Sequence, residues 1–198
     1  GCNVWNPALI GRAFLFVSFP TAMGSNFVTP YDAVSTATPL AKPELYTNLM
    51  DLFKGAHAGC IGETCIIAIL GSALFLLITH VIDWRAPLTM VATTCLCTFL
   101  ANGFDVNAVL FALTTGGLLF GATFMVTDYT TAPVTGAGRL VFGAGCGLIT
   151  FLIRQYGGYP EGVMFSILIM NSIVPFLNKL SRRKYGYPLI KTKEGAKK

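Results

Sequence analysis

One acid and four hydroxyl-bearing residues stand close together in an otherwise apolar chain, in the stretch YDAVSTATPL at residues 31–40. Pro39 disfavours helix for the residue before it and so holds Thr38 in an extended backbone. Ala37 is small, which leaves the Thr38 hydroxyl approachable, and Asp32 could assist a metal or a modifying enzyme. These residue types suit covalent modification of Thr38, although a turn rich in Ser and Thr is, on local chemistry alone, more often only a turn.

The composition places this stretch in a membrane protein. The 198 residues are 54% hydrophobic and 12% charged, with a mean hydropathy of +0.64. Soluble domains carry about 25% charged residues, so this chain cannot coat itself against water. We therefore expect an all-α, polytopic membrane protein with about six transmembrane helices and no nucleic-acid partner. The predicted spans are residues 7–23, 63–82, 88–101, 106–126, 140–153 and 163–177.

The basic residues predict the orientation. Eight of the 14 Lys and Arg residues follow the last span, so the tail at residues 179–198 should be cytoplasmic. Residues 1–178 then form the membrane domain, and the long loop at about residues 24–61 lies outside the cytoplasm with Thr38. The chain begins with Gly1 and shows no signal peptide, so we expect it to be the C-terminal part of a longer protein.

Two glycine pairs predict how the helices pack. Gly117 and Gly121 are four residues apart in one predicted span, and Gly143 and Gly147 are four apart in the next. Small residues at this spacing let two helix backbones approach closely. We expect these faces to pack against other helices instead of lipid.

The stretch DAVSTAT, residues 32–38, resembles the D-x-x-S-G-A-T signature of flavinylated membrane subunits of the RnfD/NqrB family. In that family a flavin transferase outside the cytoplasm joins FMN to the last Thr through a phosphoester bond. The resemblance implies covalent FMN on Thr38. Thr36 stands at the family's glycine position, where a second hydroxyl leaves attachment at Thr36 as an alternative. The motif residues implied in cofactor binding are Asp32, Ser35, Ala37 and Thr38.

Four further segments resemble the same family, in the same order along the chain. The last segment contains GGYPEGV, and this stretch together with the short basic tail favours RnfD over NqrB. The resemblance would cover the C-terminal half of such a protein. Two positions depart from the family pattern, Cys65 for Ser and Tyr129 for Pro. The segments are NPALIGRAFLFVSFP at residues 6–20, IGETC at 61–65, FMVTDYTTAPVT at 124–135 and LIRQYGGYPEGVMFSILIMN at 152–171.

The resemblance implies a role in a redox-driven ion translocase of bacterial or archaeal cytoplasmic membranes. The chain would be one component, inactive alone, of an Rnf complex (ferredoxin:NAD) or an Nqr complex (NADH:quinone), with other subunits and the lipid bilayer as partners. Electrons would pass through the FMN, and their passage would drive Na+ or H+ across the membrane. A second, noncovalent riboflavin is also implied, but we assign it no residues. A redox-inactive transporter and a purely structural anchor remain the rival hypotheses.

Four charged residues are further candidates. Arg12 lies in an apolar run, so it needs an anion such as the FMN phosphate, or else it reaches the interface as a structural arginine. Glu63 opens a predicted helix, where a carboxylate suits the positive end of the dipole, or it contacts the flavin. Asp128 and Glu161 flank predicted helices on opposite faces and are candidates for coupling-ion binding, or are ordinary turn residues. We expect no catalytic residue in this chain. We also expect no metal site, because the two thiols of Cys95-x-Cys97 would not share a helix face.

Overall fold

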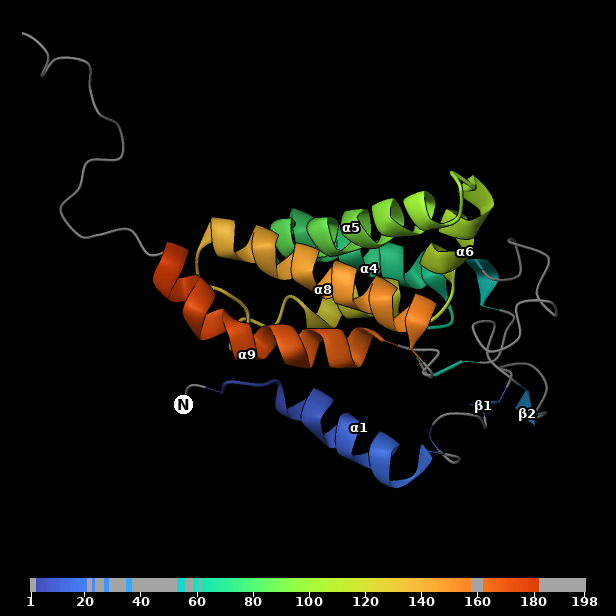
Figure 1. The fold of residues 1–198 in the computed structure, drawn as a ribbon, viewed down its shortest axis with the longest axis horizontal. Helices are drawn as coiled ribbons and strands as arrows, with labels where there is room; N and C mark the ends of the chain where they lie inside the picture. Colours follow the sequence, from blue (N-terminus) through green and yellow to red (C-terminus); the bar gives the residue numbers. More distant parts are fainter. Residues whose placement is uncertain are drawn as a thin grey trace, which may run out of the picture.

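The computed structural model describes residues 3–20, 23, 27–28, 35–36, 53–55, 59–60, 62–157 and 162–181. Their regular secondary structure is helical apart from one two-residue antiparallel pair of strands, which confirms the expected all-α fold class. The elements are α1 (Pro7–Ser18), β1 (Phe27–Val28), β2 (Ser35–Thr36), α4 (Ile66–Ile78), α5 (Arg85–Ala101), α6 (Val106–Thr114), α7 (Leu118–Phe120), the π-helix η2 (Gly121–Met125), α8 (Gly136–Tyr156) and α9 (Val163–Ser181). Figure 1 shows the long helices running side by side, with α1 along one side of the bundle.

Among the described residues, two helices are long and apolar enough to cross a membrane. They are Gly136–Tyr156 and Val163–Leu180. A bent pair, Val106–Thr114 with Leu118–Met125, would make a third span if its two halves are counted together. Helices α1, α4 and α5 are apolar but shorter, with 12, 13 and 17 residues. A multi-pass membrane protein is therefore supported, and the number of six spans stays a prediction.

Helix α8 is the centre of the bundle, because it packs against both α5 and α9. On its α5 side, a methyl group added to Gly147 would stand 2.5 Å from the Met90 carbonyl oxygen. Gly143 is similarly close to the Ala86 carbonyl oxygen. The two backbones are thus in near contact, and the Thr94 hydroxyl donates across the gap to the Gly147 carbonyl at 3.2 Å. The predicted packing role of this glycine pair is confirmed.

The predicted span at residues 106–126 is not one straight helix. The chain bends by 65° between its two halves. Gly116 lies between them with φ +68°, a backbone conformation that glycine adopts readily and other residues rarely do. The bend leaves carbonyl groups of α6 without their helical donors, and Arg154 of α8 donates to the Ala112 and Thr115 carbonyls at 2.9 and 3.2 Å.

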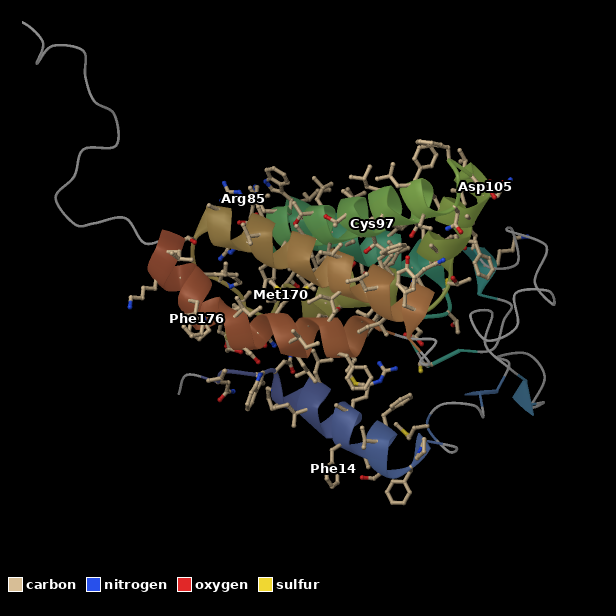
Figure 2. The ribbon with its side chains drawn as sticks, in the orientation of Figure 1. Phe14, Arg85, Cys97, Asp105, Met170 and Phe176 are labelled. Atoms are coloured by element: carbon tan, nitrogen blue, oxygen red, sulfur yellow. The ribbon has the colours of Figure 1, made fainter. Side chains whose placement is uncertain are left out.

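Helix α1 is attached to the bundle through α9. The Trp5 indole donates to the Ser172 hydroxyl at 2.7 Å, and the rings of Phe16 and Phe165 meet edge to face with centroids 6.1 Å apart. The opposite face of α1 is apolar and exposed, as Phe14 shows by pointing away from the other helices in Figure 2. The chain therefore presents apolar surface outward on this side, as a helix facing lipid or another protein does.

Candidate functional site

The motif predicted to carry FMN lies mostly outside the described residues. Of its members, the structure describes only the backbone of Ser35 and Thr36, which form β2; the others implied in cofactor binding, Asp32, Ala37 and Thr38, lie outside it. Strand β2 pairs with β1, with Phe27 opposite Thr36 and Val28 opposite Ser35. The backbone at Thr36 is thus extended, a conformation that β-branched residues favour. Replacement of the family's glycine by Thr36 is compatible with this backbone.

Two predicted site residues meet at one cysteine. Arg12 of α1 donates from Nη2 to the Cys60 Sγ at 3.4 Å. The Glu63 carboxylate accepts from the Cys60 backbone N–H at 3.3 Å, and the Glu63 N–H donates to the Cys60 carbonyl at 3.2 Å. We call Arg12, Cys60 and Glu63 the Arg12 cluster. In Figure 1 the C-terminal end of α1, the helix that carries Arg12, lies toward β1 and β2.

The position of Glu63 differs from the sequence expectation. Helix α4 begins at Ile66, with Cys65 as its N-cap residue, so Glu63 precedes the helix instead of opening it. Its carboxylate accepts from the loop N–H of Cys60. Glu63 therefore closes the turn that brings Cys60 to Arg12, and its contact with the helix dipole is secondary.

Two glycines shape the loop that carries Glu63. Gly55 is buried with φ +82°, and a Cβ there would stand 3.0 Å from the Thr64 carbonyl oxygen. Gly62 has φ +93°. Both conformations are strained for residues with a side chain. The loop geometry at the Arg12 cluster thus depends on glycine at both positions.

Asp128 is held by neighbouring donors at the end of the bundle where α1 begins. Its carboxylate accepts from the Asn6 amide at 3.2 Å, from both the N–H and the hydroxyl of Thr130 at 3.2 and 3.0 Å, and from the Thr131 hydroxyl at 3.0 Å. Asn6 is in turn the N-cap of α1, accepting from the Ala8 N–H at 3.0 Å. This network accounts for Asp128 as a residue that ties a turn to α1. Ion coupling through Asp128 stays a prediction, and Glu161 lies outside the described residues.

A second charged cluster, which the sequence did not indicate as a site, lies between α4, α5 and α8. The Asp83 carboxylate accepts from Arg139 Nη1 at 2.5 Å and lies 3.8 Å from Arg85 Nη1. Partial burial, the largest contribution, would raise the pKa of Asp83, but the Arg85 N–H and the Arg139 guanidinium together lower it below its usual value. The cluster lines a cavity of about 480 Å³, which His80, Trp84 and Tyr129 also line.

Asn171 is a third feature that the sequence did not indicate. Its side chain is fully buried on α9, and neither its amide nitrogen nor its amide oxygen has a hydrogen-bond partner among the described residues. Two other buried polar side chains of α8 and α9 are paired, since Thr150 donates to Ser166 at 2.8 Å. A buried, unpaired amide costs folding free energy, which makes Asn171 an unusual position within the bundle.

The described residues hold no group of three His, Cys, Asp or Glu side chains that could bind a metal ion. Apolar helices with exposed apolar faces, buried hydroxyls and glycine-mediated contacts define a helical membrane protein. The sequence matches the NQR2, RnfD, RnfE family over residues 1–186. The chain belongs to this family.

Three relatives match nearly the whole chain, and all three are named as the component designated D of their complexes. The one from the Na+-translocating ferredoxin:NAD+ oxidoreductase complex of Acetobacterium woodii is 40% identical over 205 residues, covering 100% of this chain and 63% of the relative. The one from the proton-translocating ferredoxin:NAD+ oxidoreductase complex of Clostridium ljungdahlii is 39% identical, covering 92% and 61%. The one from the ion-translocating oxidoreductase complex of Stutzerimonas stutzeri is 35% identical, covering 94% and 64%. The chain thus spans less than two thirds of the length of these relatives.

Proposed function

We propose that this chain is the flavin-carrying membrane part of the RnfD component in an ion-translocating ferredoxin:NAD+ oxidoreductase complex of the Rnf type. The observation that carries the proposal is the 40% and 39% identity with two proteins named for such complexes, over at least 92% of this chain. The motif DAVSTAT adds support from within the chain itself. The protein acts together with the other subunits of the complex and is matured by a flavin transferase.

In this proposal FMN is joined to Thr38 by a phosphoester bond and supplies the one-electron and two-electron chemistry. The chain supplies position and charge. Arg12 belongs to α1, the helix that precedes these strands and Thr38 in sequence, and a guanidinium suits both a phosphate and a reduced flavin. Its contact with Cys60, and the contact of Cys60 with Glu63, give the side chain a defined place.

The translocated ion is either Na+ or H+. The two relatives named for these ions are almost equally similar to this chain, at 40% and 39% identity, so overall similarity favours neither. Asp128 and Glu161 are the proposed coupling residues. The bond network of Asp128 joins the loop after η2 to α1, so a change in its charge would be felt at the helix that also carries Arg12.

An NqrB-type component of a Na+-translocating NADH:quinone reductase is the second candidate. It is favoured by the family match, which covers NQR2 as well as RnfD and RnfE. Both candidates carry the flavin on the same motif and differ in their electron donor and acceptor. A redox-inactive transporter lacks the flavin altogether, which makes flavin attachment the first test.

The test is in-gel flavin fluorescence of the full-length protein, expressed with its complex in cells that contain a flavin transferase. The boiled wild-type band should fluoresce under ultraviolet light, and Thr38→Val should abolish the signal. Thr36→Val is the matched control, because it removes a neighbouring hydroxyl of the same kind and should leave the signal intact. Loss of fluorescence in Thr36→Val but not in Thr38→Val would assign the attachment site to Thr36. A wild-type band without fluorescence, whose peptide spanning residues 32–38 has only its amino-acid mass, would refute the proposal.

A further inference from the structure

A positively charged cavity lies where α5 and α8 begin. It has a volume of about 480 Å³, within the range of small-ligand sites. Arg85 and Arg139 contribute two guanidinium groups, and Asp83 contributes the one carboxylate among the described lining residues. His80 and Tyr129 are the remaining titratable residues of the lining. We call these residues the Arg85 cavity.

The single carboxylate is shared unequally between the two arginines. Asp83 accepts a hydrogen bond from Arg139 at 2.5 Å, and Arg139 also donates from Nε to the Pro133 carbonyl at 2.9 Å. Arg85 lies 3.8 Å from the same carboxylate oxygen, beyond hydrogen-bond distance. The Asp83 carboxylate therefore compensates the charge of Arg139 more strongly than that of Arg85.

The helix ends around the cavity add to the positive potential. Arg85 is the first residue of α5, and its Nη1 lies so close over Gly136, the first residue of α8, that a methyl group there would collide with it. Arg139 is in the first turn of α8. The positive ends of two helix dipoles and two guanidinium groups thus converge, and helix N-termini favour anions over cations. An anion in the cavity would stabilise this arrangement.

The surroundings place the cavity at the edge of the apolar surface. Trp84 is 54% exposed and stands with its ring 6.0 Å from the Arg85 guanidinium, while Val81 and Leu88 are 69% and 58% exposed. Tryptophan and arginine together mark the level of lipid headgroups in membrane proteins. Figure 2 shows Arg85 at one end of α5 and Asp105 beyond the other, so the cavity lies where the apolar helices end.

We propose that the Arg85 cavity is a binding site for a phosphate ester, supplied by the headgroup of an anionic phospholipid, with Arg85 as its main cation. A guanidinium binds phosphate oxygens through two parallel N–H groups, which gives geometry as well as charge. Basic pockets between membrane helices on the cytoplasmic side are known to suit anionic headgroups. The orientation expected from the basic tail puts this end of the bundle on that side.

The test uses the purified complex in detergent, titrated with fluorescent phosphatidylglycerol, with phosphatidylcholine as the zwitterionic control lipid. The wild type should bind phosphatidylglycerol at least about five-fold more tightly than phosphatidylcholine. Arg85→Gln should weaken phosphatidylglycerol binding about five-fold, the value of one basic residue near a membrane surface. Lys179→Gln, which removes the same charge from α9 outside the cavity lining, should change it less than about two-fold. Equal binding by wild type and Arg85→Gln would overturn the proposal.

Two further arms keep the result unambiguous. Asp83→Asn removes the competing carboxylate, so an anion site predicts tighter phosphatidylglycerol binding, whereas weaker binding in a folded Asp83→Asn protein would contradict the proposal. Arg85→Lys keeps the charge but loses the paired N–H groups of the guanidinium, and it replaces Arg85→Gln if that variant does not fold. Its affinity for phosphatidylglycerol should lie between those of the wild type and Arg85→Gln. Inorganic phosphate is the competitor. If phosphate displaces the lipid only at phosphate concentrations far above the lipid concentration, the site prefers the lipid headgroup. If phosphate displaces the lipid at similar concentrations, the site is assigned to soluble phosphate instead.

Discussion

The close contact between α5 and α8 makes a quantitative prediction about three glycines. Replacing Gly147 with Ala puts a methyl group 2.5 Å from the Met90 carbonyl oxygen, a backbone atom that cannot move without shifting α5. Gly145→Ala meets only the flexible Met170 side chain, at 2.5 Å from its terminal carbon. Gly71 of α4 has nothing within 4 Å of an added methyl group. The added methyl group thus meets a backbone atom at Gly147, a flexible side chain at Gly145 and open space at Gly71.

The magnitude follows from two opposing terms. Every Gly→Ala change in a helix gains about 1 kcal/mol of helix propensity. Forcing a methyl group into a closely packed interface costs about 1–3 kcal/mol. The propensity term is common to Gly147→Ala and Gly71→Ala, so the difference between their free energies of unfolding isolates the collision, at about 1–3 kcal/mol. In a cooperative unit of this size that difference corresponds to roughly 2–12 °C in Tm, and in a larger cooperative unit the shift is smaller.

The assay is the thermal midpoint of the purified complex, read by fluorescence-detected size exclusion after heating. Gly71→Ala should match or exceed the wild-type midpoint, Gly147→Ala should fall below it, and Gly145→Ala should lie between the two because the Met170 side chain can adopt another rotamer. The Thr94 hydroxyl bond to the Gly147 carbonyl would also lengthen in Gly147→Ala. A Gly147→Ala protein as stable as Gly71→Ala would refute the close approach of α5 and α8.

Two further predictions concern single polar groups. Asn171→Leu should raise stability by about 1–3 kcal/mol, because it removes a buried amide without partners among the described residues; a lower thermal midpoint would show that the amide binds a polar partner. Asp83 has a lowered pKa, so its contribution to stability is complete above the usual carboxyl pKa and is lost as the pH falls through the lowered value. Acidification below about pH 4 should therefore lower the thermal midpoint of the wild type more than that of Asp83→Asn, and equal responses would contradict this role.

Patterns that are local in sequence were predicted well. The helical, apolar character of the chain follows from composition and run length, and the contact at Gly143 and Gly147 follows from their spacing on one helix face. Both depend on residues within two turns of each other. The family resemblance was equally readable, because its motifs are contiguous segments, and the match over residues 1–186 confirms it.

Contacts between distant residues were not predicted. Arg12 and Cys60 are 48 positions apart, and nothing in either segment indicates that the guanidinium lies at that thiol. Asp83 and Arg139 are 56 positions apart, and the sequence indicates only a turn at the first and a helix start at the second. Such pairs are set by the way helices pack, which periodicity along one helix does not specify. The sequence therefore located candidate residues but not their partners.

The break between α6 and α7 shows how these two kinds of information combine. Gly116 and Gly117 permit a bend, but glycines also occur within straight membrane helices, so the sequence of the span alone favoured one continuous helix. Bending leaves the last carbonyls of α6 unpaired in an apolar environment, which is costly unless donors are supplied. Arg154 supplies two of them from α8, to Ala112 and Thr115, and its positive charge also suits the negative end of the α6 dipole. An arginine that directly follows one predicted span and a glycine pair within another thus form one structural feature, and the bend is stable because both are present.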